Sequence, residues 1–213
     1  MKITVAGSFH EPNWTAVRET VKKLEAAGHT VLAPGSDWEP INNNASFIKF
    51  KGEENTPIFN LEEGFLNSML QSDVFVICNA NHREGYAVSF EFGFATAAIL
   101  SKSGPLKKIC FTNPPLGYDK FKANPALSME EYIYNLFHDP SYHHELSAYE
   151  NHNDRESDFH WPTPEDMYID MKDWFQKMLV LDSRGAFEIG LDSLLNKNTG
   201  ETKRRIGNDD YER

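Results

Sequence analysis

Cysteine is scarce in this sequence of 213 residues, and long hydrophobic runs are missing from it. The two cysteines, Cys78 and Cys110, each lie inside a short apolar run. They indicate buried thiols of a reducing compartment rather than a disulfide framework. No stretch approaches the roughly 18 consecutive apolar residues of a membrane span, and the early first strand leaves no room for a signal peptide. We therefore expect a cytoplasmic protein that does not bind a membrane.

Basic residues are also in the minority. The chain has 21 Lys and Arg against 32 Asp and Glu, which gives a formal net charge of −11. This balance argues against a partner of nucleic acid, because such binding needs a basic surface. The one basic cluster, Lys203 to Arg205, is typical of a solvated tail. A small anionic ligand stays compatible with the sequence, since backbone amides at helix N-termini hold phosphate without side-chain charge.

Several well-known site motifs are absent. There is no G-x-x-x-x-G-K-[ST] loop, and no G-x-G-x-x-G follows the first strand, which argues against P-loop NTPases and dinucleotide dehydrogenases. Five of the eight histidines fall between residues 138 and 160, but without the H-E-x-x-H or C-x-x-C spacing of a ligand set. We expect no metal and no cofactor.

What the sequence does contain is an alternation of strands and helices. Apolar runs predict strands at 2–6, 30–33, 74–78 and 108–112, with helices after Pro12, around 61–70 and at 88–100. A polar stretch at 35–57 predicts a long loop. The pattern is typical of an α/β fold with a doubly wound parallel sheet, flavodoxin-like or Rossmann-like. We assign this domain to residues 1–115.

Residues 116–213 are predicted to be a mostly helical extension of unknown function. A capped helix is expected at 128–137 and a second helix from about Pro164 to Val180, with a frayed tail from Asn196. The second helix carries an apolar face with Trp174, Phe175 and Met178. That face must be buried, so we expect the extension to pack on the first domain as one unit.

In a doubly wound sheet, ligands bind beyond the carboxyl ends of the strands, at the point where the strand order reverses. With a flavodoxin-like order, the first and third strands are neighbours there. The substrate-binding residues expected at this edge are Gly7, Ser8, Phe9 and Asn79. Asp37 and Trp38, in the loop after the second strand, are candidates for contact with a base; alternatively, Trp38 packs against its own loop.

One charged residue, Glu91, lies in an otherwise uncharged stretch from Gly85 to Leu100. Burying a carboxylate in such surroundings costs several kcal/mol unless it is compensated. A place in the first turn of a helix would compensate it, because the helix dipole and the free amides favour an anion. Glu91 is therefore either a functional carboxylate or an ordinary acidic residue at a helix start.

Three segments together resemble the nucleoside 2-deoxyribosyltransferase family, which includes related nucleotide N-glycosidases. They are the opening strand Ile3–Phe9, the run Ser72-Asp73-Val74-Phe75-Val76, and the pattern Gly85…Glu91-Phe92-Gly93-Phe94-Ala95. The resemblance covers about residues 2–113. It implies a nucleoside or nucleotide substrate, and a homo-oligomer, because family members build their sites next to subunit interfaces.

The resemblance also implies roles for single residues. Glu91 would be the nucleophile that attacks the anomeric carbon, ionised in the first turn of its helix and pointing into the crevice near Gly7 and Asn79. Asp73 matches an acidic position of the family and would act as a catalytic acid; it serves equally well as a structural cap. Gly93 and Ala95 would let the helix approach the sheet.

Two positions depart from the family pattern. Gly85 stands where transferases of free nucleosides carry an aspartate and where nucleotide N-glycosidases carry a small hydroxyl residue. The family's first-strand tyrosine is absent, and Tyr86 is the candidate to replace it. Gly85 and Tyr86 are both expected to contact the substrate. These departures leave open the base, the sugar, the need for a 5′-phosphate, and the choice between hydrolysis and transfer.

The function expected is cleavage or exchange of the N-glycosidic bond of a (deoxy)nucleoside or nucleotide through a glycosyl-enzyme intermediate on Glu91. A non-catalytic nucleotide-binding or sensing module on the same fold is the alternative. A third possibility is a structural α/β domain whose role lies in the C-terminal half. Release of a free base distinguishes the first from the other two.

Overall fold

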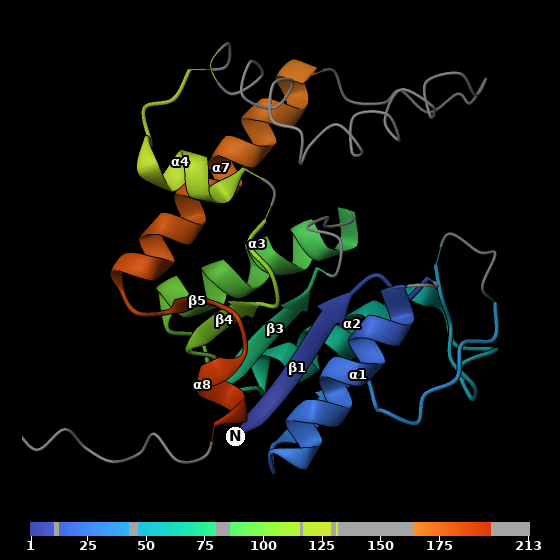
Figure 1. Cartoon of the computed structure of the whole chain (residues 1–213). Helices are drawn as coiled ribbons and strands as arrows, with labels where there is room; N and C mark the ends of the chain where they lie inside the picture. The colour runs from blue at the N-terminus through green and yellow to red at the C-terminus, as the bar shows by residue number, and fades with distance from the viewer. Residues whose placement is uncertain are drawn as a thin grey trace, which may run out of the picture.

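A five-stranded, all-parallel sheet organises the chain in the computed structural model, which describes residues 1–10, 13–42, 47–79, 86–115, 117–128, 131 and 164–196 (Figure 1). The strand order is β2-β1-β3-β4-β5. The strands are β1 (Lys2–Gly7), β2 (Thr30–Ala33), β3 (Val74–Cys78), β4 (Lys108–Phe111) and β5 (Phe187–Ile189). This order confirms the doubly wound, flavodoxin-like fold and the neighbouring first and third strands.

Helices cover both faces of the sheet. They are α1 (Asn13–Ala26), α2 (Ile58–Leu70), α3 (Tyr86–Ser101), α4 (Tyr118–Ala123), α7 (Pro164–Ser183) and α8 (Asp192–Leu195). Helices α1 and α8 lie on one face, and α2, α3 and α7 on the other (Figure 1). The helices expected from the sequence in the first half are all present. Among the described helices, none combines the length and the apolar character needed to cross a bilayer.

Strand β3 is the centre of the core. All five of its residues are buried, as expected from its unbroken apolar run. Its side chains alternate between two hydrophobic clusters: Phe75 and Ile77 face α2 and α3, whereas Val74 and Val76 face α1. Cys78 and Cys110 are buried free thiols, as predicted. Burial raises the pKa of Cys110 to about 12, so this thiol is inert at neutral pH.

The C-terminal half adds structure that the sequence did not predict. Strand β5 pairs parallel with β4, with Ile109 opposite Phe187, and thereby completes the sheet. It is only three residues long and lies between Gly185 and Gly190, which makes it too short to recognise by periodicity. Helices α4 and α8, of six and four residues, were missed for the same reason.

The predicted burial of the aromatic helix face is confirmed. Phe175 and Met178 on α7 are 2% and 0% exposed and join the same cluster as β3 and α3. The partly buried Trp174 packs on Phe92, with ring centroids 4.5 Å apart. Two reciprocal hydrogen bonds join Ser128 and Glu131, from each backbone N–H to the other's side-chain oxygen, which is the capping expected there. The rest of that helix and the histidine-rich segment lie outside the described residues.

Substituting Phe175 tests whether α7 belongs to the same cooperative unit as the sheet. Phe175→Ala should lower the free energy of unfolding by about 3–5 kcal/mol, because it opens a cavity in the shared core. A single cooperative transition in denaturant, monitored by circular dichroism and by tryptophan fluorescence, is expected for both proteins. The neighbouring exposed Gln176→Ala is the matched control. Two separate transitions, with the first alone shifted, would contradict this picture.

Candidate functional site

The carboxyl edge of the sheet brings the two predicted loops together. In the parallel register of β1 and β3, Gly7 lies opposite Cys78, so Ser8 and Asn79 leave the sheet side by side. Gly7 has a packing role: a Cβ there would lie 2.7 Å from Val17 Cγ2 and 2.8 Å from the Cys78 carbonyl oxygen. Glycine is therefore required for β1 to lie this close to α1 and β3.

Asn79 connects the carboxyl ends of β3 and β4 by hydrogen bonds. Its Oδ1 accepts hydrogen bonds from Thr112 Oγ1 (3.1 Å) and from the backbone N–H of Asn113 (2.9 Å). Its Nδ2 donates to the carbonyl of Asn113 at 2.9 Å. The side chain is 1% exposed. These bonds engage both ends of the amide, so Asn79 orders the edge of the site, and we do not assign it a contact with substrate.

An aromatic cluster lies beside this edge, on the α1 side. Phe9 packs edge-on against Trp14 and Phe50, with centroids 5.6 and 5.4 Å apart. Trp38 joins the cluster through Phe50, at 5.0 Å. Trp38 thus packs against its own loop, the alternative considered from the sequence. Asp37 is exposed next to it. Ser8 and Phe9 are partly buried at this edge.

Asp73 lies at the opposite edge of the sheet. Its Oδ2 accepts a hydrogen bond from the backbone N–H of Lys2, the first residue of β1, at 2.8 Å. Strand β3, five residues long at about 3.3 Å per residue, separates Asp73 from the carboxyl edge by roughly 16 Å. The carboxylate therefore caps the start of β1, and it is not placed to act as an acid beside Glu91.

Glu91 lies on the buried face of α3 but not in its first turn. The helix begins at Tyr86, so Glu91 is its sixth residue, and the first turn contains no acidic residue. The side chain is only 7% exposed, and Oε2 has no hydrogen-bond partner among the described residues. The expected compensation by free backbone amides is missing, because those amides belong to the first turn.

This environment shifts the pKa of Glu91 well above its ordinary value. Removal of the carboxylate from water is the largest cause, and the negative charge of Glu62 is the second. The expectation that the helix dipole holds Glu91 ionised is therefore wrong. A buried carboxyl that lies near a like charge, with one oxygen unpartnered among the described residues, has an energetic cost, which is typical of functional sites.

Glu62 is a candidate that the sequence analysis missed. It lies on α2 and is partly buried, and burial raises its pKa too. The sequence contained a signal: Glu62 shares helical spacing with Phe65, Leu66 and Met69, the apolar face of α2. An acidic residue on the inward face of an amphipathic helix is unusual, whereas its neighbour Glu63 is exposed as expected.

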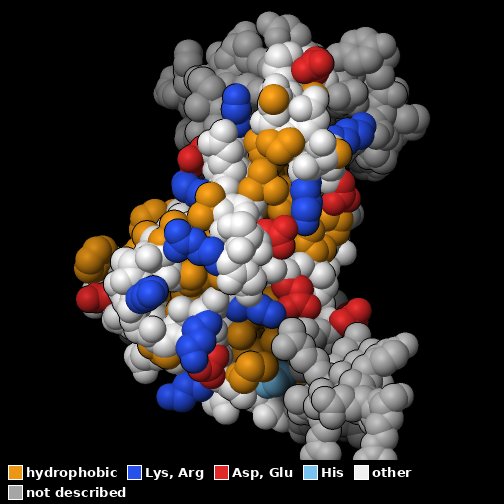
Figure 2. Space-filling view, turned by 90° about the vertical axis from the view of Figure 1, so that its left-hand side faces the viewer, with side chains coloured by type: hydrophobic (Ala, Val, Ile, Leu, Met, Phe, Trp, Pro, Cys, Tyr) orange, Lys and Arg blue, Asp and Glu red, His pale blue; other side chains and the backbone are white. Residues whose placement is uncertain are grey.

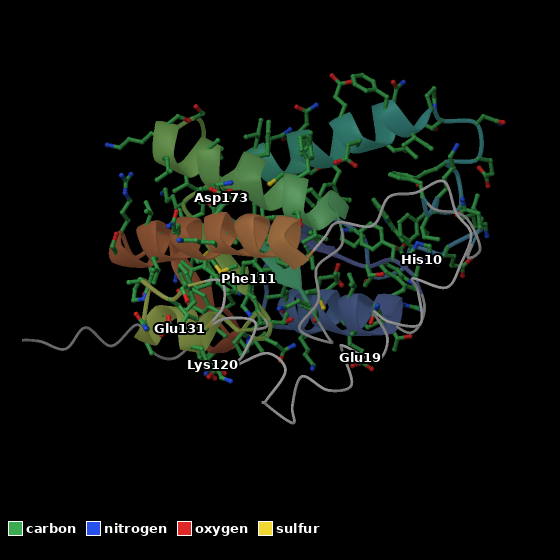
Figure 3. All side chains as sticks on the ribbon, turned by 90° about the horizontal axis from the view of Figure 1, so that it is seen from above. His10, Glu19, Phe111, Lys120, Glu131 and Asp173 are labelled. Carbon is green, nitrogen blue, oxygen red and sulfur yellow. The ribbon has the colours of Figure 1, made fainter. Side chains whose placement is uncertain are left out.

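The two glutamates lie at similar depth below the carboxyl edge. Helices α2 and α3 both begin at this edge, contact each other and lie side by side when the molecule is seen from above (Figure 3). Glu62 is the fifth residue of α2 and Glu91 the sixth of α3. At about 1.5 Å per residue, each lies some 6–8 Å along its helix. The fold thus pairs two carboxyls from adjacent helices.

The remaining predicted positions are only partly described. Gly85 lies outside the described residues, and Tyr86 is the first residue of α3. Ala95 is fully buried, as a packing position should be, but a Cβ on Gly93 would meet nothing within 4 Å. Gly93 therefore has no role in close packing. Among the described residues, no group of three or more His, Cys, Asp or Glu side chains is arranged to hold a metal ion.

Charges of both signs are mixed on the face shown in Figure 2, where Lys and Arg lie among Asp and Glu and the described residues of this face form no continuous basic surface. Comparisons of the chain with family models, with curated proteins and with solved structures found no match. The functional argument therefore depends on the residues of the site themselves.

The buried carboxyl of Glu91 makes a prediction about stability. Because its pKa is raised in the folded state, the unfolded chain releases this proton at lower pH, and stability falls as pH rises from about 4.5 through the raised value. Glu91→Gln keeps the shape without the charge. It should raise the free energy of unfolding at pH 8 by more than about 1 kcal/mol, with a smaller difference near pH 5.

The measurement is urea unfolding of both proteins across this pH range, with the exposed Glu63→Gln as the matched control. A gain that is equally large at pH 5 and pH 8, or is shared by Glu63→Gln, would show that Glu91 is not a buried titrating group.

Proposed function

We propose that this protein is an enzyme that cleaves or exchanges the N-glycosidic bond of a (deoxy)nucleoside or nucleotide, with Glu91 as the nucleophile. The observation that carries the proposal is the buried carboxyl of Glu91, whose Oε2 has no hydrogen-bond partner among the described residues and which lies near the carboxyl edge of a doubly wound sheet. The motif around Glu91, which resembles that of nucleoside 2-deoxyribosyltransferases, supports the same chemistry.

The chemistry uses the properties of this carboxyl. Breaking an N-glycosidic bond develops positive charge on the sugar, and a carboxylate beneath the ring can attack the anomeric carbon and form a covalent glycosyl intermediate. A poorly solvated carboxylate interacts strongly with that charge, because little water screens it. The environment that makes ionised Glu91 costly in the free protein is therefore offset when the transition state supplies a positive partner.

The alternative function is a non-catalytic nucleotide-binding or sensing module on the same fold. It is favoured by the engagement of Asn79 in structural bonds and by the position of Asp73 at the far edge, since both remove expected members of the site. Under this alternative, nucleosides or nucleotides bind but no base is released.

Glu91→Gln tests the proposed chemistry. A panel of nucleosides, deoxynucleosides and their 5′-monophosphates is first screened for release of free base by the native protein. On the best substrate, the variant should lose activity by on the order of a thousandfold or more, with binding largely retained, because only the transition state requires the anion. Glu63→Gln should retain full activity.

A 2-fluoro-2-deoxy analogue of the same substrate should leave a covalent adduct on Glu91, detected by mass spectrometry of the digested protein. Near-full activity of Glu91→Gln on a substrate that the native protein turns over would refute the nucleophile. Binding of substrate without release of base from any member of the panel would favour the sensing module.

We also propose that the protein is a cytoplasmic homo-oligomer. Exposed apolar side chains at the starts of α2 and α3 support association: Phe59 and Phe90 are 75% and 57% exposed. Light scattering at micromolar concentration should give a mass of at least two chains, and Phe90→Ser should lower it. A monomeric mass for the native chain would contradict this proposal.

A further inference from the structure

We propose that Glu62 is a second catalytic residue of the site and that it delivers a proton to the departing base. This inference rests on the proposed function and deepens it. Neither the motif around Glu91 nor the resemblance assigns a role to Glu62, and the position expected to supply the acid, Asp73, lies at the other edge of the sheet.

The geometry rests on three observations. Helices α2 and α3 pack against each other and begin at the same edge of the sheet (Figure 1). Glu62 lies on the inward face of α2, and Glu91 lies on the buried face of α3 about one and a half turns from its start. Phe92, the residue after Glu91, contacts Trp174 of α7. Because consecutive residues of a helix point in different directions, we infer that Glu91 lies on the side of α3 that faces α2.

The charge of Glu62 acts on Glu91, and no cation among the described residues compensates it. Glu62 is the one charged group there that acts on Glu91, and its effect is repulsive. The strands beneath α3 present residues that do not titrate in this range, such as Ala6, Ile77 and Phe111. Two carboxyls whose charges repel each other ionise one at a time, so that as pH rises the pair passes through a state with one proton and one negative charge.

One shared proton meets the needs of the reaction. The proton moves from Glu91 to Glu62, which leaves Glu91 as a carboxylate. An oxygen of Glu91 then bonds to the anomeric carbon while the carbon–nitrogen bond breaks, and its electron pair departs with the base. Glu62 gives its proton to the base and becomes a carboxylate.

The second half of the reaction restores the pair. Water attacks the anomeric carbon, the bond from that carbon to Glu91 breaks, and the proton lost by water goes to Glu62. When a second base attacks instead, Glu62 takes the proton of that base. In both cases Glu91 ends as a carboxylate and Glu62 holds the proton, so the pair begins the next cycle with one proton and one charge.

Substrates that differ in their need for a proton separate this role from a structural one. Each variant is assayed with the nucleoside or nucleotide identified in the screen and with 4-nitrophenyl 2-deoxyribofuranoside, whose leaving group departs as a stable anion. With the first substrate, Glu62→Gln should lower kcat by about 10²- to 10⁴-fold with little change in KM. With the second, the rate of 4-nitrophenolate release in the first turnover should stay within about threefold of the native protein, because this leaving group needs no proton and Glu62 acts only later, when the intermediate is broken down. Glu63→Gln, adjacent and exposed, should match the native protein with both.

The pH profile of the native protein tests proton donation by Glu62 without any substitution, so the result does not depend on whether a variant folds. With the natural base as leaving group, kcat/KM should be bell-shaped, because the pair must hold one proton. With 4-nitrophenolate, the decline at high pH should disappear, since the doubly ionised pair still contains the nucleophile.

The outcomes distinguish this proposal from the proposed function. Glu62 is not the proton donor if Glu62→Gln releases the natural base as fast as Glu63→Gln does. The same holds if Glu62→Gln slows the release of both leaving groups equally. Profiles of the same shape with both leaving groups lead to the same conclusion. If Glu91→Gln retains release of 4-nitrophenolate, the proposed function itself is wrong.

Discussion

The structure depends on the complete burial of β3. This strand lies between β1 and β4 and is covered on both faces, so each of its backbone polar groups must find a partner within the sheet. That requirement fixes the register of β3 with β1, which runs from Ile3 opposite Val74 to Gly7 opposite Cys78. The places where β1 and β3 leave the sheet, and where α3 begins, follow from this register.

The candidate site has a cost that the core must offset. Among the described residues, Oε2 of Glu91 has no hydrogen-bond partner, and the charged group that acts on Glu91 is a second carboxyl rather than a cation. A residue selected only for stability at this position would be apolar, like Val88 and Ala95 on the same helix face. Fully buried aromatic residues, such as Phe92 and Phe111, contribute the packing that lets the fold tolerate this charge.

The sequence predicted the parallel sheet because its first four strands are apolar runs separated by amphipathic helices, and periodicity reports that pattern directly. It also singled out Glu91, since one charge in a long apolar stretch is conspicuous. It did not reveal that Asp73 lies at the amino edge of the sheet, where its carboxylate accepts a hydrogen bond from Lys2, while Glu91 lies below the carboxyl edge, because proximity in the sequence pattern does not report which end of a strand a side chain faces. Glu62 was missed because an adjacent glutamate, Glu63, made the pair look like an ordinary solvated surface.

Other features depend on interactions between distant residues, which the sequence does not report. Asn79 was predicted to contact the ligand from its place after a strand, and its bonds to Thr112 and Asn113 could not be foreseen from that place. The start of α3 at Tyr86 moved Glu91 out of the first turn by two residues. Helix boundaries depend on capping and on tertiary contacts, which apolar spacing does not report.

Strand β5 pairs with β4 although the two strands lie far apart in the sequence. Ile109 pairs with Phe187, and Lys108 Nζ bonds to Glu188 Oε2 at 2.7 Å, so contacts across some 80 residues close this side of the sheet. During synthesis, the first four strands leave the ribosome well before β5 does. Until then, β4 is an edge strand with unpaired N–H and C=O groups beside hydrophobic residues, a surface to which other unfinished chains can add. The nascent protein is therefore most exposed to aggregation in the interval before β5 pairs with β4.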